Sequence, residues 1–252
     1  MKENREIFIN PRYAYLTDFI EKLPLNFDKE GVLIRCDRNT VKCFEIGTVR
    51  INVKEFCVPS FFLNRFIYCN LRKPKAVRAY ENAIKLKDVG IESPVPIAYM
   101  LRKRGGMLLK SYFVSVQYLH EESITDLEMA DLDDRVADMF SKFGCFTAYL
   151  HNQGMFHGDY GNGNILINHK DEEPIFTLID TNRMKFGDIS IIKGCKEFNR
   201  LHLTPQKIAI ISKSYAKERG FDEKQVNQNI IDFQSKHRRK KRLKSLKRIL
   251  KG

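Results

Sequence analysis

The sequence predicts an α+β fold of two lobes, an N-terminal antiparallel five-stranded sheet with one helix and a C-terminal lobe that is mainly helical. Three observations predict it. Residues 32–56 alternate polar and apolar side chains in three short runs separated by turn residues, which is typical of an antiparallel meander. Residues 131–153 carry apolar side chains at helical spacing and end at Gly154. The chain has 252 residues, 43% of them hydrophobic, which suits one large domain or two small lobes.

The elements of the first half follow from these patterns and from the turn residues between them. We expect, in order, a helix at 12–23, strands at 32–36, 40–46 and 49–56, a helix at about 75–89, and strands at 97–101 and 107–119. Gly90 is the expected end of the second helix. The apolar and then basic run after Phe56 fits neither period, and no element is predicted there.

The second half is expected to begin with the long helix, which leads into a polar turn, "HGDYGNGN". A hairpin of "ILIN" and "FTLID" follows, and two helices capped by Thr204-Pro205 and Asp222 close the lobe. We therefore predict an N-terminal lobe over 1–119, a C-terminal lobe over 120–235 and a basic tail over 236–252. The cleft between two such lobes is the expected ligand site.

Charge is concentrated in the tail. Residues 236–251 hold ten Lys and Arg and no acid, out of a net charge of +13 for the chain, so the rest is nearly neutral. The six cysteines form no C-x-x-C pair, the first residues are too charged for a signal peptide, and no apolar run is long enough to span a bilayer. We expect a cytoplasmic protein with reduced cysteines, peripheral at the inner face of the inner membrane if the tail binds lipid.

The polar turn carries the candidate chemistry. His157, Asp159 and Asn164 lie between the long helix and the hairpin, and Asp180 closes the second hairpin strand. Phosphoryl transfer from ATP needs a carboxylate that orients the acceptor and receives its proton, and oxygen ligands for Mg²⁺. Asp159 is the predicted carboxylate, Asn164 and Asp180 are the predicted metal ligands, and His157 is expected to hold the loop by hydrogen bonds. The alternative is an ordinary polar helix-to-strand turn with a helix cap.

Binding of the ATP phosphates is expected to fall to the first half. The third strand, "INVKEF", carries Lys54, and the next helix offers Glu81 as its partner. The alternatives are a solvated lysine and a surface pair of Glu81 with Lys85. The turn between the first two strands, "CDRNT", has no glycine, so we expect the phosphates to be covered by a short turn around Asn39 that uses backbone amides and Arg38.

These residues resemble the protein-kinase-like superfamily, in particular its small-molecule and atypical branches, which carry "HGD" where protein kinases carry "HRD". The chain is most similar there to the lipopolysaccharide-core kinases, the Kdo/heptose kinase family. The similarity extends over roughly 30–200 and includes "VKEF", "RKPKAVRAYENA", "GIESPVPIAY", "HGDYGNGNIL" and "LIDTNRMKFG". Because "HGD…GNIL" is also similar to aminoglycoside and choline kinases, that motif alone selects no substrate.

The resemblance implies a bilobal protein-kinase-like fold and ATP-dependent phosphorylation of a sugar hydroxyl on the lipopolysaccharide inner core, at the cytoplasmic membrane face. It gives Lys54, Glu81, Asp159, Asn164 and Asp180 the roles argued above. The chain departs from protein kinases in "DTN", which stands in place of "DFG", and in lacking A-P-E. With 72 residues after Asp180, we expect a small or lipid-linked acceptor rather than a protein.

Two features leave alternatives open. Arg183, in "DTNRM", either binds an anionic carboxylate or phosphate of the acceptor or forms a structural salt bridge.

If the tail is a helix, its leucines and isoleucine lie on one side and its lysines and arginines lie on the other. The apolar set is Leu243, Leu246, Ile249 and Leu250. This pattern suits an anionic membrane surface, and a disordered basic terminus is the alternative. No nucleic-acid partner is expected, because the body is nearly neutral and carries no recognised nucleic-acid motif.

The leading hypothesis is a magnesium- and ATP-dependent kinase of Kdo or heptose in a lipid-linked acceptor. An atypical protein kinase or a soluble small-molecule kinase is the second hypothesis. A pseudokinase, acting as a nucleotide-binding scaffold, is the third.

Overall fold

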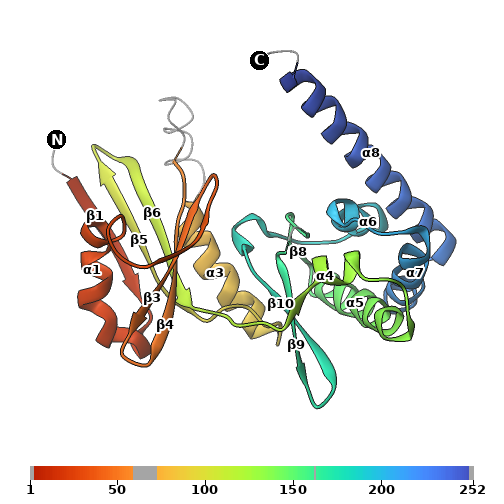
Figure 1. Ribbon diagram of the computed structural model, residues 1–252, viewed down its shortest axis with the longest axis horizontal. Helices are drawn as coiled ribbons and strands as arrows, with labels where there is room; N and C mark the ends of the chain where they lie inside the picture. The colour runs from red at the N-terminus through yellow and green to blue at the C-terminus, as the bar shows by residue number, and fades with distance from the viewer. Residues whose placement is uncertain (1–2, 59–72, 162, 250–252) are drawn as a thin grey trace. The chain divides into compact units, whose positions relative to one another are not determined.

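The computed structural model of the chain describes residues 3–58, 73–161 and 163–249. The chain divides into two compact units, residues 1–119 and 120–252, each with its own core (Figure 1). The predicted sheet and its first helix lie in the first unit, and the long helix, the polar turn and the hairpin lie in the second.

The first unit is built on one antiparallel sheet of six strands in the order β1-β5-β6-β4-β3-β2. The strands are β1 (Glu3–Ile9), β2 (Val32–Cys36), β3 (Thr40–Ile46), β4 (Val49–Glu55), β5 (Pro96–Arg104) and β6 (Met107–Val116). The meander β2–β3–β4 and the hairpin β5–β6 agree with the prediction.

The expected count of five strands was wrong, because β1 adds a sixth at the edge of the sheet beside β5. Its sequence, "ENREIFI", begins with four polar residues and shows little alternation. Its charged side chains find partners on β5, where Arg102 pairs with Glu3 at 2.6 Å and Lys103 with Glu6 at 2.6 Å. These partners lie almost a hundred residues away in sequence, so local periodicity does not reveal the strand.

Helices pack on both faces of this sheet. The region predicted as one helix at 12–23 forms a 3-10 turn, η1 (Pro11–Leu16), followed by α1 (Thr17–Asn26). Buried residues of α1 belong to the same hydrophobic cluster as Met100 of β5, whereas buried residues of α3 (Lys75–Asp88) belong to the same cluster as the next residue, Leu101. Because neighbouring residues of a strand point to opposite faces, α1 and α3 cover opposite faces of the sheet (Figure 1).

The second unit combines helices with a short hairpin. Its helices are α4 (Ile124–Met129), α5 (Asp134–Asn152), α6 (Ile191–Glu197), α7 (Pro205–Arg219) and α8 (Glu223–Ile249). Its strands are β7 (Glu122–Ser123), β8 (Met155–Phe156), β9 (Ile165–Lys170), β10 (Glu173–Leu178) and β11 (Lys185–Phe186). The caps expected at Thr204 and Asp222 are present, since their side chains accept the backbone N–H of Lys207 at 3.3 Å and of Gln225 at 2.8 Å.

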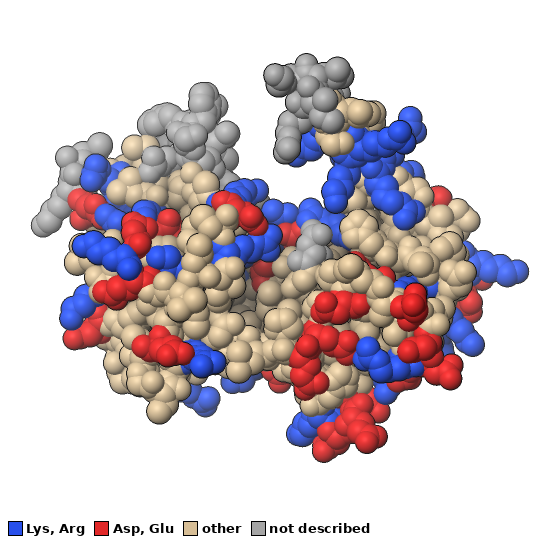
Figure 2. Space-filling model, in the orientation of Figure 1, with Lys and Arg blue, Asp and Glu red and all other residues tan. Residues whose placement is uncertain are grey.

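Helix α8 continues without a break into the basic segment. Its first half is buried at Val226 and Ile230, whereas Leu243 and Leu246 are about half exposed among lysines and arginines. Figure 2 shows Lys and Arg gathered along the exposed part of this helix. Leu250, the last member of the predicted apolar set, lies outside the described residues. No helix in the described part of the chain has the length and hydropathy needed to cross a bilayer.

A buried lysine closes the C-terminal end of α4. Lys207, 2% exposed, donates from Nζ to the carbonyl oxygens of Leu127, Glu128 and Ala130 at 2.9, 2.9 and 2.6 Å. These are carbonyls of the last helical turn and the residue after it, which have no partner within the helix.

The side chain of Glu128, in the same helix, has a buried oxygen, Oε1, with no hydrogen-bond partner among the described residues. Burial raises the pKa of this carboxyl from its ordinary 4.5 to about 7.

This raised pKa makes stability depend on pH. Between the ordinary pKa and the raised one, the unfolded chain loses the Glu128 proton while the folded chain keeps it, so folding stability falls as pH rises through this window. We predict that Glu128→Gln stabilises the protein by on the order of 1 kcal/mol at pH 8 and by much less at pH 5. Urea unfolding at the two pH values measures this, with the exposed Glu92→Gln as control. An equal effect at both pH values would contradict the prediction.

Candidate active site

The polar turn connects β8 to β9 and is held from inside by His157. This side chain is fully buried, and its Nε2 lies 2.9 Å from the carbonyl oxygen of Ile179. Its Nδ1 accepts the backbone N–H of Asp159 at 3.3 Å, so the proton of the neutral ring is on Nε2. His157 therefore positions the loop and ties it to the end of β10.

Asp159 projects from this loop between two arginines. Its side chain is 10% exposed, and Oδ2 lies 3.2 Å from Nη1 of Arg183. Oδ1 accepts a hydrogen bond from Nη1 of Arg200. The structure thus shows the salt bridge that was one alternative for Arg183, and it adds Arg200 as a second partner.

Asn164 and Asp180 lie at the same end of the β9–β10 hairpin. The two strands pair from Ile165 opposite Leu178, and the N–H of Ile179 continues the ladder to the carbonyl of Asn164 at 3.0 Å. The Asn164 Nδ2 donates to the backbone oxygen of Asp159 at 2.9 Å, and the amide oxygen takes no part in this bond. Asp180 turns the chain away from the strand in the left-handed conformation, with φ of 57°.

The donors at this end of the hairpin suit Mg²⁺. The Asn164 amide oxygen and the Asp180 carboxylate are hard oxygen ligands, and Mg²⁺ commonly uses one or two protein ligands together with phosphate oxygens and water. The described residues contain no group of three or more His, Cys, Asp or Glu that could hold a metal by themselves. The set therefore fits a metal that arrives with a nucleotide, and it does not fit a structural zinc site.

Two glycines let the loop approach the segments that carry the arginines. Gly158 has φ of 76°, and a Cβ there would lie 3.0 Å from the carbonyl oxygen of Arg183. Gly161 has φ of 138°, and a Cβ there would lie 3.1 Å from Cβ of Arg200. Both positions combine a backbone conformation that side chains disfavour with a close contact, so a larger residue would move the arginines relative to the loop.

Glu197, at the end of α6, anchors the backbone of the loop. Its side chain is buried, and its two oxygens accept the backbone N–H groups of His157 at 2.8 Å and Gly158 at 2.9 Å. His151 lies behind it, with Nε2 3.5 Å from the carboxylate and Nδ1 2.8 Å from the hydroxyl of Tyr215. Burial lowers the pKa of His151, which favours its neutral form.

Glu197 and Arg200 were not predicted from the sequence. Both come from "KEFNR", 38 and 41 residues after Asp159, and that stretch has no motif or spacing that sets it apart. Only the folding of α6 and η3 (Phe198–Arg200) against the loop reveals them.

The candidates of the first unit are described separately. Lys54 lies on β4, with its Nζ 5.2 Å from the ring centroid of Phe56. Glu81 lies on α3 as expected, but its carboxylate pairs with Lys73 at 2.6 Å and, within the described residues, not with Lys54. Both members of that pair are substantially exposed, so it contributes little to stability.

The β2–β3 turn holds the other two candidates. Arg38 is exposed there, and Asn39 is partly buried. The Asn39 Oδ1 accepts the backbone N–H of Cys57 at 3.1 Å, so this side chain ties the turn to the end of β4. This bond uses the Oδ1 oxygen of Asn39, whereas a phosphate oxygen would need an N–H donor, which Arg38, the backbone amides and the Asn39 Nδ2 can each provide.

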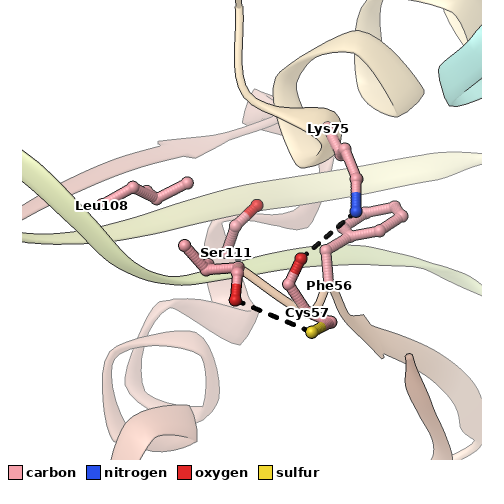
Figure 3. A pocket seen from close by; sticks show the side chains of 6 residues that line it. Phe56, Cys57, Lys75, Leu108 and Ser111 are labelled. Atoms are coloured by element: carbon pink, nitrogen blue, oxygen red, sulfur yellow. Dashed lines mark hydrogen bonds between the residues drawn. The ribbon is translucent and has the colours of Figure 1, made fainter. Parts of the chain in front are cut away.

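A small pocket lies where β4 ends and α3 begins (Figure 3). Its lining residues are Phe56, Cys57, Val58, Lys75, Leu108 and Ser111. The Lys75 side chain reaches across Phe56, with Nζ 3.2 Å from the carbonyl oxygen of Cys57 and 5.7 Å from the ring centroid of Phe56. Because Lys54 approaches the same ring, two ammonium groups lie near one aromatic side chain at the end of this strand.

Comparisons with known proteins bear on the family and the fold of this chain. The model of the lipopolysaccharide kinase (Kdo/WaaP) family matches residues 60–235. No curated protein sequence matches the chain. The structure is similar to that of WaaP in complex with acyl carrier protein, with 11% sequence identity, a TM-score of 0.63, and coverage of 93% of this chain and 97% of the other. It is also similar to the microcompartment-associated aminopropanol kinase, with 11% identity, a TM-score of 0.54 and coverage of 86% of each chain. These likenesses confirm the predicted α+β, protein-kinase-like fold class.

The anchor formed by Glu197 leads to a prediction about the loop. Glu197→Ala leaves the buried amide of His157 and the partly buried amide of Gly158 without an acceptor, and we expect it to cost about 2–4 kcal/mol of unfolding free energy. Glu197→Gln keeps one acceptor oxygen and should cost less. Urea unfolding and hydrogen exchange at the two amides measure these effects. The exposed Glu218→Gln is the control, expected within about 0.5 kcal/mol of the unchanged protein. Unchanged amide protection in Glu197→Ala would contradict the anchoring role.

Proposed function

The chain belongs to the lipopolysaccharide kinase (Kdo/WaaP) family, and we propose that it phosphorylates a hydroxyl of Kdo or heptose in the inner core of lipopolysaccharide with ATP. Family membership makes it a phosphotransferase that acts on a hydroxyl group. The main support for the proposed chemistry is the convergence of three candidate residues. Asp159, Asn164 and Asp180 are separate in sequence, yet the loop and the hairpin bring them together within one unit and inside the segment that matches the family.

We assign the residues of the second unit as follows. The Asp159 carboxylate orients the acceptor hydroxyl and accepts its proton as the hydroxyl oxygen bonds to the γ-phosphorus of ATP. The bond from that phosphorus to the bridging oxygen breaks, and ADP leaves with the bonding electrons. Asn164 and Asp180 would hold Mg²⁺, which neutralises charge on the phosphates when bound. His157 and Glu197 fix the loop so that Asp159 keeps its place.

We assign phosphate binding to residues of the first unit. Lys54 is the proposed ligand of the ATP phosphates, and Arg38 with the backbone of the β2–β3 turn is proposed to cover them. Asn39 supports the turn through its bond to Cys57. Glu81 is proposed to orient Lys54 by breaking its ion pair with Lys73 and forming one with Lys54 instead. Breaking the Lys73 pair costs little free energy, because exposed ion pairs are weak.

We place the acceptor on a lipid at the cytoplasmic membrane face. The exposed part of α8 supports this, since it presents half-exposed leucines among basic side chains on one continuous helix (Figure 2). Basic residues near an anionic bilayer each contribute about 1 kcal/mol, and buried leucines add to this. The inner face of the inner membrane is therefore the proposed location.

The decisive test is transfer from labelled ATP to Kdo-lipid A. Asp159→Asn removes the proton acceptor while preserving the shape of the side chain, and we expect kcat to fall about 10²–10⁴-fold with ATP binding nearly unchanged. The exposed Asp188→Asn should behave as the unchanged protein. Label on a generic protein and not on the lipid would favour a protein kinase. Full function of Asp159→Asn in cells would favour a nucleotide-binding scaffold.

The tail can be tested apart from catalysis. Replacing both Leu243 and Leu246 with Glu should weaken binding to phosphatidylglycerol vesicles by about tenfold or more, because two apolar contacts are lost and two like charges are added. Sedimentation with vesicles measures this, and Leu132→Glu, at another exposed leucine, is the control. Equal binding of the unchanged protein to phosphatidylglycerol and neutral phosphatidylcholine would contradict a role for the tail.

A further inference from the structure

Both oxygens of the proposed proton acceptor are already engaged. Arg183 lies 3.2 Å from Oδ2 of Asp159, Arg200 donates to Oδ1, and the Asp159 side chain is only 10% exposed. An acceptor hydroxyl must form a hydrogen bond to one of these oxygens before it can lose its proton. Each carboxylate oxygen can accept more than one hydrogen bond, but an arginine on each oxygen and the burial of the side chain leave a hydroxyl little access unless a guanidinium moves aside.

The fold places these two arginines at the loop. The carbonyl of Arg183 lies against Gly158, and Cβ of Arg200 lies against Gly161, where added side chains would come within 3.0 and 3.1 Å. The two arginines come from separate short helices, η2 (Thr181–Arg183) and η3, which converge on one carboxylate. A surface ion pair formed by chance would not need two glycines in the loop to admit the backbones of its partners.

The guanidinium groups also have capacity for a ligand. The side chains of Arg183 and Arg200 are 39% and 31% exposed, so each group has a side open to solvent. A guanidinium has five N–H donors in a planar fork, and within the described contacts each arginine reaches Asp159 through one nitrogen. The remaining donors match the two oxygens of a carboxylate or phosphate.

The surroundings of Arg200 are positive as well. Burial, together with the charges of Arg200, Lys241, His202 and Lys240, lowers the pKa of His237 on α8. All four of these neighbours are basic. An anion next to Arg200 would be attracted by this set, whereas a neutral sugar would gain nothing from it.

We propose that Arg183 and Arg200 form a binding site for an acidic group, a carboxylate or a phosphate, on the acceptor sugar. This group draws a guanidinium away from Asp159 and gives the hydroxyl access to the carboxylate. The inference rests on the proposed function and narrows its substrate class. The acceptor is an acidic sugar such as Kdo, or a sugar that already carries phosphate, and a neutral heptose is a poor acceptor.

The test compares acidic sugars with neutral counterparts on the full-length chain. Binding is measured by NMR titration for Kdo, for Kdo with its carboxyl group reduced to an alcohol, for heptose and for heptose phosphate. We expect at least tenfold tighter binding of an acidic sugar than of its neutral counterpart, and the two pairs separate carboxylate from phosphate. Arg200→Ala should remove this preference, and Arg200→Lys should keep only part of it, because lysine lacks the planar fork.

Two controls identify the cause of any loss. Arg135→Ala, which removes another exposed, ion-paired arginine of the same unit, should bind sugars as the unchanged protein does. The Kd for ATP should stay the same in Arg200→Ala. If Arg200→Ala fails to fold, as judged by urea unfolding, Arg200→Lys and Arg183→Lys carry the comparison.

The outcomes separate this inference from the proposed function. Equal binding of acidic and neutral sugars would overturn the inference even if phosphoryl transfer occurs. Loss of ATP binding instead of sugar binding in Arg200→Ala would also overturn it, because the arginine would then serve the nucleotide. Acid-selective binding that depends on Arg200, without transfer to any sugar, would support the inference while the proposed function fails.

Discussion

The candidate site depends on one interaction, the pair of hydrogen bonds from successive backbone amides of the loop to the carboxylate of Glu197. The N–H of His157 is buried and that of Gly158 is partly buried, and a buried amide without an acceptor costs about 1–3 kcal/mol. A single carboxylate satisfies both N–H groups and fixes the direction in which the chain leaves β8. These two bonds therefore also determine where the backbone of the next residue, Asp159, and its side chain lie.

An aromatic cluster supports the loop from below. Tyr160, the residue after Asp159, is buried and stacks on Phe143 of α5, with ring centroids 5.5 Å apart. Its hydroxyl forms a hydrogen bond of 2.9 Å with Thr147, one helical turn further along α5. Phe198 meets both rings edge to face, and it lies between Glu197 and Arg200 in sequence. The same packing that fills the core thus places the anchor and one of the two arginines.

The outline of the fold could be predicted, because it depends on local patterns. Alternation marked β2, β3 and β4, helical spacing marked α3 and α5, and Thr204 and Asp222 marked two helix starts. Strand β1 was missed, because its pairing with β5 relies on charges nearly a hundred residues apart. Helix α6 was missed as well, since its seven residues are too few to show a clear period.

The sequence by itself determined the candidates for the chemistry, since His157, Asp159, Asn164 and Asp180 are proposed from their residue types and spacing. It did not determine what surrounds them. Only the tertiary structure decided that Glu197 and Arg200 join the loop, that Arg183 contacts Asp159, and that Glu81 pairs with Lys73. The physical reason is that motif spacing follows from short-range backbone geometry, whereas the partners of a buried charge depend on which distant segments packing brings within reach.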